Sequence, residues 1–257
     1  MTALERPLPG RSLPARPRPA GPQAAPAAEL VSVERPMLGG RVGIHLRSDS
    51  PDHQSTARTG SRILDRVEAW AGRLTRFDPR SELSRLNASP ARSMAIGPTL
   101  AAVLDWARAA ETATDGIVDV ALLEQRLAAE RGEASPLLAY RHWSLARGAR
   151  GTIVHRTPGL RFDIDGLAKG WLADRAVSLL AGFPIAVVDA DGDVAVGLDP
   201  GADLWLGVAD PESPAMNLSV LRLANDSATR EAYGVATSGV SVHRWGSGAR
   251  ARHHLID

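Results

Sequence analysis

The stretch Asp163-Ile164-Asp165-Gly166-Leu167-Ala168-Lys169-Gly170-Trp171 separates a predicted strand, residues 160–164, from a predicted helix, residues 167–181. Glycines at such a junction let a ligand approach the backbone, and the first turn of a helix offers N–H groups to phosphate oxygens. Lys169 would add a full positive charge in that first turn. The stretch therefore indicates a pyrophosphate site, although its spacing is neither G-x-G-x-x-G nor G-x-x-x-x-G-K-[ST]. A helix start with Asp165 as its N-cap would have the same sequence without any ligand, so the residues alone leave both interpretations open.

Lys169 also stands out in the composition, because it is the only lysine in the chain. The chain has 30 basic residues, so the other 29 are arginines. A single lysine could survive such a bias by chance. The alternative is that a compact ammonium does something that a planar guanidinium cannot, such as lying among phosphate oxygens.

Amphipathic helices precede this stretch, and short strands follow it. Apolar residues fall on one helical face at offsets 0, +4, +7, +11 and +14, from Ile63 through Val67, Trp70 and Leu74 to Phe77. A second stripe of Leu100, Val103, Leu104 and Ala107 ends near residues 114–116, and we interpret both stripes as core. We expect an extended opening at 30–46 and strands at 152–154, 160–164, 185–188, 193–196, 205–208, 218–223 and 234–237. This order predicts a single α+β domain over residues 30–257, with N-terminal helices and a mixed β-rich C-terminal part.

The overall composition excludes several classes of function. The chain has 257 residues, a formal net charge of +1 and no cysteine, which excludes disulfides, thiolate metal sites and cysteine nucleophiles. Balanced charge gives no drive toward nucleic acid, and no apolar run approaches the roughly 18–20 residues of a membrane span. Residues 1–29 are rich in Pro, Arg and Ala and lack the apolar stretch of a secretory signal. We expect this segment to be disordered and the protein to be cytoplasmic, without direct membrane insertion.

Two further clusters could carry chemistry. Asp189-Ala190-Asp191-Gly192-Asp193 resembles the start of a calcium loop, but its twelfth position is Pro200 instead of a bidentate Glu, so a tight turn between strands is the better interpretation. The segment 234–239, which ends in Thr237-Ser238-Gly239, could bind phosphate or turn a strand. His254 and Asp257 are spaced to act together, but Ser238 lacks the G-x-S-x-G elbow of a hydrolase triad.

Taken in chain order, these segments resemble the ApbE family, the FAD:protein FMN transferases. The matching segments run from residue 37 to the end of the chain: Met37-Leu38-Gly39-Gly40, residues 77–87 ("pdSelsrlN"), 116–119 ("GaFD"), 163–170 ("DlGGiaKG"), 189–193 ("vnlGGdi"), 205–211 ("W.vgi.dP"), 235–239 ("vATSG") and 254–257 (the opening of "HIiDPrTG"). The resemblance implies an enzyme that transfers FMN from FAD to a Thr or Ser hydroxyl of a target protein and releases AMP. Such a target could be a flavin-carrying reductase subunit.

The resemblance also implies roles for individual residues. Lys169 and His254 would be the catalytic residues, with Lys169 on the pyrophosphate and His254 helping to activate the incoming hydroxyl. The remaining candidate FAD-binding residues are Met37, Phe77 (stacking on the isoalloxazine ring), Asp119, Asp163, Gly166, Ala168, Gly170, Thr237, Ser238 and Gly239. The family also uses Mg²⁺, toward which Ala168 would offer its backbone carbonyl.

The sequence departs from the family pattern in two places. Asp165 occupies a usual glycine position and adds negative charge near the phosphates. The chain stops at Asp257, before the segment whose Asp and Thr ligate Mg²⁺, which we expect to weaken binding of this ion. Two alternatives to the transferase therefore stay open: a pyrophosphatase that hydrolyses FAD to FMN and AMP, and a truncated paralogue that binds FAD without catalysis.

Overall fold

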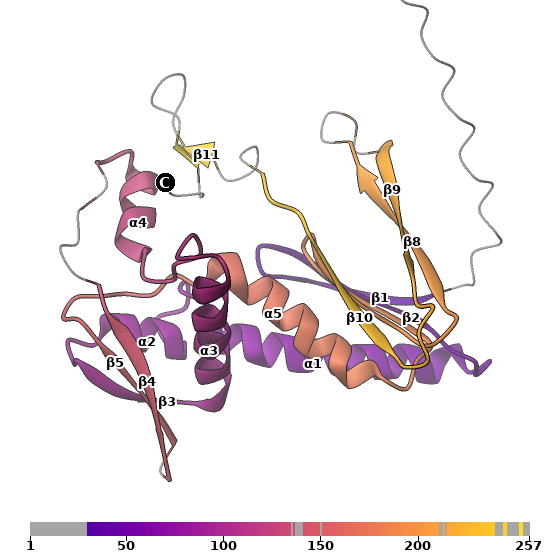
Figure 1. Ribbon diagram of the computed structural model, residues 1–257, viewed down its shortest axis with the longest axis horizontal. Helices are drawn as coiled ribbons and strands as arrows, with labels where there is room; N and C mark the ends of the chain where they lie inside the picture. The colour runs from indigo at the N-terminus through magenta and orange to yellow at the C-terminus, as the bar shows by residue number, and fades with distance from the viewer. Residues whose placement is uncertain are drawn as a thin grey trace, which may run out of the picture.

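An antiparallel sheet of five strands forms one end of the molecule (Figure 1). In spatial order its strands are β1 (Val31–Met37), β2 (Gly40–Arg47), β6 (Ile185–Ala190), β7 (Asp193–Leu198) and β10 (Glu231–Ala236). Two of its hairpins have two-residue turns, Leu38-Gly39 and Asp191-Gly192, in which all four residues have positive φ. Such turns match the twist of the flanking strands. The pairing of Val42 with Ala190 places both turns at the same end of the sheet.

The computed structural model describes residues 30–134, 136, 141–149, 151–210, 213, 215–239, 244–245 and 252–253. The predicted disordered segment, residues 1–29, lies outside these residues.

Both faces of the five-stranded sheet are covered. Helices α1 (His53–Leu74) and α5 (Asp165–Val177) pack on one face, and the hairpin of β8 (Asp203–Ala209) and β9 (Asn217–Ala224) packs on the other. In β6, Ala186 and Val188 face the helices, whereas Ile185 and Val187 face the hairpin side. Side chains alternate along a strand, so the continuous apolar run of β6 is what a strand buried on both faces requires.

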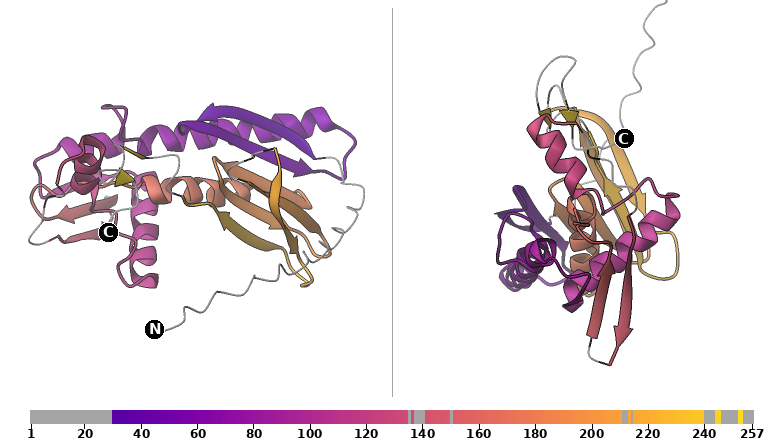
Figure 2. Two further views of the ribbon diagram at one scale, coloured as in Figure 1. Left: turned by 90° about the horizontal axis from the view of Figure 1, so that it is seen from above. Right: turned by 90° about the vertical axis from the view of Figure 1, so that its left-hand side faces the viewer.

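A second, smaller sheet lies at the other end of α1 (Figures 1 and 2). Its spatial order is β3 (Ser93–Ile96), β5 (Gly151–Arg156) and β4 (Trp143–Gly148). Around it lie α2 (Glu82–Ala88), α3 (Pro98–Ala113) and α4 (Leu123–Arg131). The remaining elements are a 3₁₀ turn η1 (Ser178–Leu180) and the short pair β11 (Arg244–Trp245) and β12 (Arg252–His253), which contacts α4.

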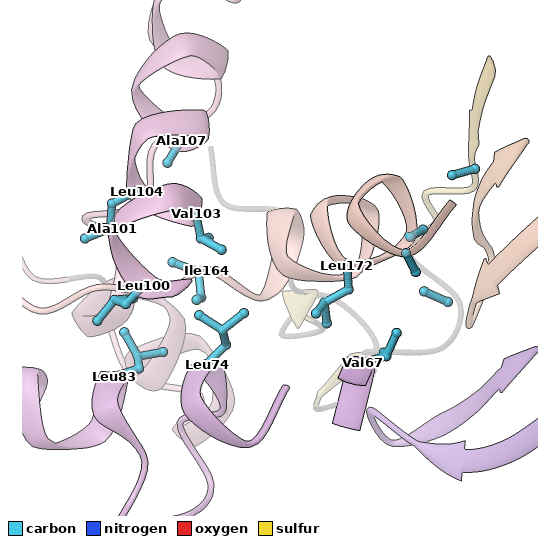
Figure 3. Close-up of a cluster of buried hydrophobic side chains, with 14 of the residues drawn as sticks. Val67, Leu74, Leu83, Leu100, Ala101, Val103, Leu104, Ala107, Ile164 and Leu172 are labelled. Atoms are coloured by element: carbon cyan, nitrogen blue, oxygen red, sulfur yellow. The ribbon is translucent and has the colours of Figure 1, made fainter. Parts of the chain in front are cut away.

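One hydrophobic core joins the two ends of the molecule. Figure 3 shows Leu83 of α2 and Leu100 of α3 beside Leu74 at the end of α1, with Ile164 and Leu172 leading onto α5. All five are buried, and burial of each such side chain contributes roughly 1.5–3 kcal/mol. The core therefore fixes the end of α1 against the start of α5, which is where the candidate site lies.

The predicted fold class is confirmed, as is the stripe on α3, whose four residues are all buried. The first stripe is confirmed only as far as Leu74, where α1 ends. Phe77 lies beyond the helix and is 77% exposed, so its predicted place in the core is wrong. The physical reason is that Thr75 turns the chain into an extended conformation, so the helical period no longer applies to Phe77.

The predicted strand at residues 160–164 is also wrong. The segment is irregular, although Phe162 and Ile164 are buried. The side-chain amide of Asn87 hydrogen-bonds to both the N–H and the C=O of Phe162, each at 2.8 Å. Asp163 N–H donates to the Val120 carbonyl at 2.8 Å. These partners satisfy the buried backbone without a neighbouring strand. The other predicted strands and the helix after Asp165 are present with shifted ends.

Candidate active site

The start of α5 differs in one respect from the expected capped helix. Asp165 is the first helical residue, and it is the side chain of Asp163 that accepts a hydrogen bond from the Asp165 N–H, at 3.0 Å. The prediction of Asp165 as N-cap is therefore wrong. Burial raises the pKa of Asp163 above its ordinary value, and the hydrogen bond from Asp165 opposes this effect. Because the helix begins at Asp165, Lys169 lies at the start of the second turn instead of the first.

A cavity of about 780 Å³ opens beside this helix start. Its walls come from the β1–β2 turn, the end of α1 and the following loop, α2, α4, the start of α5 and the β6–β7 turn. The lining residues are Met37, Leu38, Gly39, Glu68, Ala71, Gly72, Leu74, Thr75, Arg76, Phe77, Leu83, Arg126, Glu130, Asp163, Ile164, Asp165, Ala168, Lys169, Leu172 and Asp191. This volume lies within the range of small-molecule binding sites, roughly 300–1,000 Å³.

Five of the predicted site residues meet in this one lining: Met37, Phe77, Asp163, Ala168 and Lys169. They come from segments that are far apart in the chain. Gly166 and Gly170 lie on the same helix outside the lining. A Cβ on Gly170 would come within 3.9 Å of an Asp193 carboxylate oxygen and 3.7 Å of the Trp106 ring.

The ammonium of Lys169 is held at the rim of the cavity by the turn that follows β6. Its Nζ donates to Asp191 Oδ2 at 2.7 Å, and the Lys169 side chain is only 20% exposed. Nearby, burial raises the pKa of the Asp193 carboxyl, and the charge of Lys169 opposes that rise. Asp189 stabilises the turn by accepting a hydrogen bond from the Gly192 N–H at 2.8 Å. The acidic cluster 189–193 is therefore a tight turn between two strands, as predicted.

Two arginines in the lining, Arg76 and Arg126, are not among the residues predicted from the sequence. Arg76 pairs with Glu130 at 2.5 Å, and its guanidinium carbon lies 4.3 Å from the centroid of the Phe77 ring. Arg126 contacts the same Glu130 at 3.0 Å and reaches Asp165 at 3.5 Å. The positive charge of Arg126 thus offsets the extra carboxylate of Asp165. The i,i+4 spacing of Arg126 and Glu130 on α4 was a usable signal, whereas nothing local pointed to Arg76.

Four of the other predicted residues are described but are not part of the cavity lining: Asp119, Thr237, Ser238 and Gly239. Asp119 accepts a hydrogen bond from the Ala121 N–H at 2.7 Å and pairs with Arg141 at 3.1 Å. Thr237 follows β10 and lies beside the β6–β7 turn, 3.9 Å from where a Cβ on Gly192 would be. Ser238 and Gly239 follow it and are exposed. His254 lies outside the described residues.

The described residues do not by themselves make a metal site. Among them, no group of three or more His, Asp or Glu side chains is placed to hold a metal ion. The Ala168 carbonyl lies within α5 and would need side-chain ligands from elsewhere to hold Mg²⁺.

An α+β fold that holds a cavity of this size, with an exposed aromatic ring and a lysine in its lining, defines a candidate small-molecule binding site. The sequence comparison gives the family: the model of the ApbE family matches residues 38–257, and the chain belongs to this family. A search of curated proteins gives no match.

Solved structures show the same fold. The ApbE protein of Thermotoga maritima is 20% identical, with a TM-score of 0.69 over 89% of this chain and 76% of that one. The Pseudomonas stutzeri flavinyl transferase ApbE is 17% identical, with a TM-score of 0.64 over 89% and 74%. The Vibrio cholerae flavin transferase ApbE is 19% identical, with a TM-score of 0.55 over 76% and 68%. At these identities the likeness establishes the fold.

In the described part of the chain, no helix is both long and apolar enough to cross a membrane.

Proposed function

We propose that this protein is an FAD:protein FMN transferase. Family membership supports a flavin transferase, and two of the similar structures are described as such enzymes. The observation that carries the finer proposal is the cavity that gathers Met37, Phe77, Asp163, Ala168 and Lys169 into one lining. In the proposed reaction, the hydroxyl oxygen of a target Thr or Ser bonds to the phosphorus of the FMN half. The bond from that phosphorus to the bridging oxygen breaks, AMP leaves with the electron pair, and the hydroxyl loses its proton.

The phosphate end of the ligand would lie at the start of α5. Lys169 supplies a full positive charge on a flexible side chain. Its ammonium can therefore stay close to the negative charge that develops on the leaving AMP. Arg126 lines the same cavity and is shared between Glu130 and Asp165. Alignment of the reactants and positive groups near the phosphates are the main contributions that a protein makes to phosphoryl transfer.

The isoalloxazine ring would lie against the loop after α1. Phe77 is 77% exposed, and the Arg76 guanidinium contacts its ring. An exposed aromatic ring that lines one cavity with the apolar Leu74 and Leu83 offers a stacking surface for a flat ring system. Stacking on a flavin would explain why the Phe77 side chain is exposed, because Phe77 does not pack in the protein core.

The acceptor hydroxyl would need a group that takes its proton. The resemblance of the segment 254–257 to the ApbE family supports His254 in this role. Thr237 beside the β6–β7 turn would contribute to the nucleotide pocket, as would Asp119, Ser238 and Gly239. The Mg²⁺ requirement and the cytoplasmic location stay predictions.

An assay with FAD, Mg²⁺ and the acceptor domain of a flavin-carrying reductase subunit tests the proposal. We expect AMP release together with covalent flavin fluorescence on the acceptor, and the loss of both when its Thr is replaced by Val. AMP without a labelled acceptor would instead support a pyrophosphatase. FAD binding without either product would support a non-catalytic FAD-binding protein, and parallel reactions with EDTA would show whether Mg²⁺ is needed.

A further inference from the structure

The described lining of the cavity holds more negative than positive side chains. Its cationic residues are Arg76, Arg126 and Lys169, and its acidic residues are Glu68, Glu130, Asp163, Asp165 and Asp191. Each of the three cations already contacts a carboxylate at 2.5–3.0 Å. A diphosphate that enters this cavity therefore meets cations that are engaged, and it must share or replace their partners.

The partner of Lys169 is the one most open to exchange. The two arginines share Glu130 within a network that also includes Asp165, whereas Lys169 meets Asp191 through one hydrogen bond at the cavity rim. The Asp191 side chain is 38% exposed, so water can reach the carboxylate when the ammonium leaves. Exchanging one partner of a flexible ammonium requires no movement of the backbone.

The β6–β7 turn holds the Asp191 carboxylate in a defined place. Asp191 is the first residue of this turn and has φ +59°, a left-handed conformation that Asp followed by Gly favours in a two-residue hairpin turn. Its carboxylate lies against Gly40 at the end of the β1–β2 turn, where a Cβ would come within 2.0 Å of Asp191 Oδ1. The absence of a side chain at Gly40 thus leaves the space that the carboxylate fills while it contacts Lys169.

We propose that Asp191 competes with the phosphate groups of the substrate for Lys169, and so sets the affinity of the site for FAD. In the free protein the carboxylate holds the ammonium at the rim. When FAD binds, the ammonium moves from Asp191 to the diphosphate. The inference rests on the proposed function for the identity of the ligand, whereas the contact between Lys169 and Asp191 does not depend on it.

The variant Asp191→Asn distinguishes two roles for Asp191. If Asp191 competes with phosphate for Lys169, FAD affinity rises in the variant; if Asp191 only positions Lys169 for the ligand, FAD affinity falls. Asparagine tolerates the left-handed conformation and keeps the size of the side chain, but it removes the charge. Under competition, the FAD dissociation constant falls on the order of fivefold, as for the loss of one partly exposed ion pair. Riboflavin has no phosphate, so its affinity stays within twofold of the wild-type value. An FAD affinity that is unchanged or weaker in this variant overturns the proposal.

Gly40→Ala provides a second variant that changes no charge. The added methyl group would occupy the space of the Asp191 carboxylate and displace the carboxylate from Lys169. FAD affinity should therefore rise, as in Asp191→Asn. Asp203→Asn is the matched control, because Asp203 pairs with Arg222 on the β8–β9 hairpin and neither residue is part of the cavity lining. It should leave FAD affinity unchanged, and an equal gain in this control would overturn the specific competition.

The single lysine permits a test that needs no FAD. Protein labelled with ¹³C,¹⁵N-lysine has one labelled side chain, Lys169, whose NMR signal reports its partner directly. We expect the signal to shift in Asp191→Asn, and inorganic pyrophosphate to shift it at severalfold lower concentration in the variant than in the wild type. If the Lys169 NMR signal is unchanged in Asp191→Asn, the proposal is overturned. If FAD binds neither protein but both NMR shifts occur, the proposed function fails and the competition for Lys169 stands.

Discussion

Replacing Phe77 by Ala separates ligand binding from folding, because the ring is 77% exposed in the free protein. Loss of a side chain that packs so little should change the free energy of unfolding by no more than about 0.5 kcal/mol. A flavin stacked on the ring would cover most of it. Full burial of a Phe side chain is worth about 1.5–3 kcal/mol, and stacking adds about 0.5–1.5 kcal/mol.

We therefore expect Phe77→Ala to lose about 2 kcal/mol of FAD binding, roughly a 30-fold rise in the dissociation constant. Quenching of FAD fluorescence measures the affinity, and urea unfolding measures the stability of the same samples. Phe77→Tyr keeps the ring and should stay within about threefold of the wild type.

Trp205→Ala is the matched control for this experiment, because Trp205 is also an exposed aromatic residue, 46% exposed, but lies on β8 away from the cavity. It should leave FAD affinity unchanged. A Phe77→Ala dissociation constant within twofold of the wild type would refute the assignment of the flavin to this loop.

Three further predictions address the lysine, the loop before α5 and the buried carboxyl. Lys169→Arg should weaken FAD binding about tenfold without lowering the melting temperature, because a planar guanidinium cannot replace a compact ammonium among phosphates; equal affinities in a binding titration would contradict this. Asn87→Ala leaves the buried backbone of Phe162 without two hydrogen bonds and should cost about 2–4 kcal/mol in urea unfolding, whereas a loss under 1 kcal/mol would show that water replaces the amide. Burial raises the pKa of Asp163 in the folded state, so the folded protein holds this proton more tightly than the unfolded chain, and wild-type stability falls as the pH rises through the raised pKa. Asp163→Asn should therefore be more stable than the wild type at pH 7, and its advantage should shrink as the pH falls toward the ordinary carboxyl pKa; an advantage that does not change with pH would count against a buried charge.

The elements could be predicted wherever they depend on local pattern. The α3 stripe and the run at residues 185–188 follow the helical and strand periods, and both proved buried. The pattern failed at Phe77 and at residues 160–164, where the chain is apolar but irregular. At Phe77 the helix has already ended at Leu74, and the extended conformation of Thr75 breaks the helical period. At residues 160–164 the backbone is held by partners distant in the sequence, such as Asn87, which lies 75 residues from Phe162. No local period can report such a contact.

For the candidate site, the sequence by itself determined the residue types at the start of α5, the single lysine, the tight turn at 189–193 and the family, because these are properties of short segments and of their order. Only the tertiary structure decided which side chains meet in the cavity. Arg76 pairs with Glu130 over 54 residues of sequence, and Lys169 meets Asp191 over 22. Charge pairing acts over a few ångströms in space, so it depends on how α1, α4, α5 and the β6–β7 turn pack together.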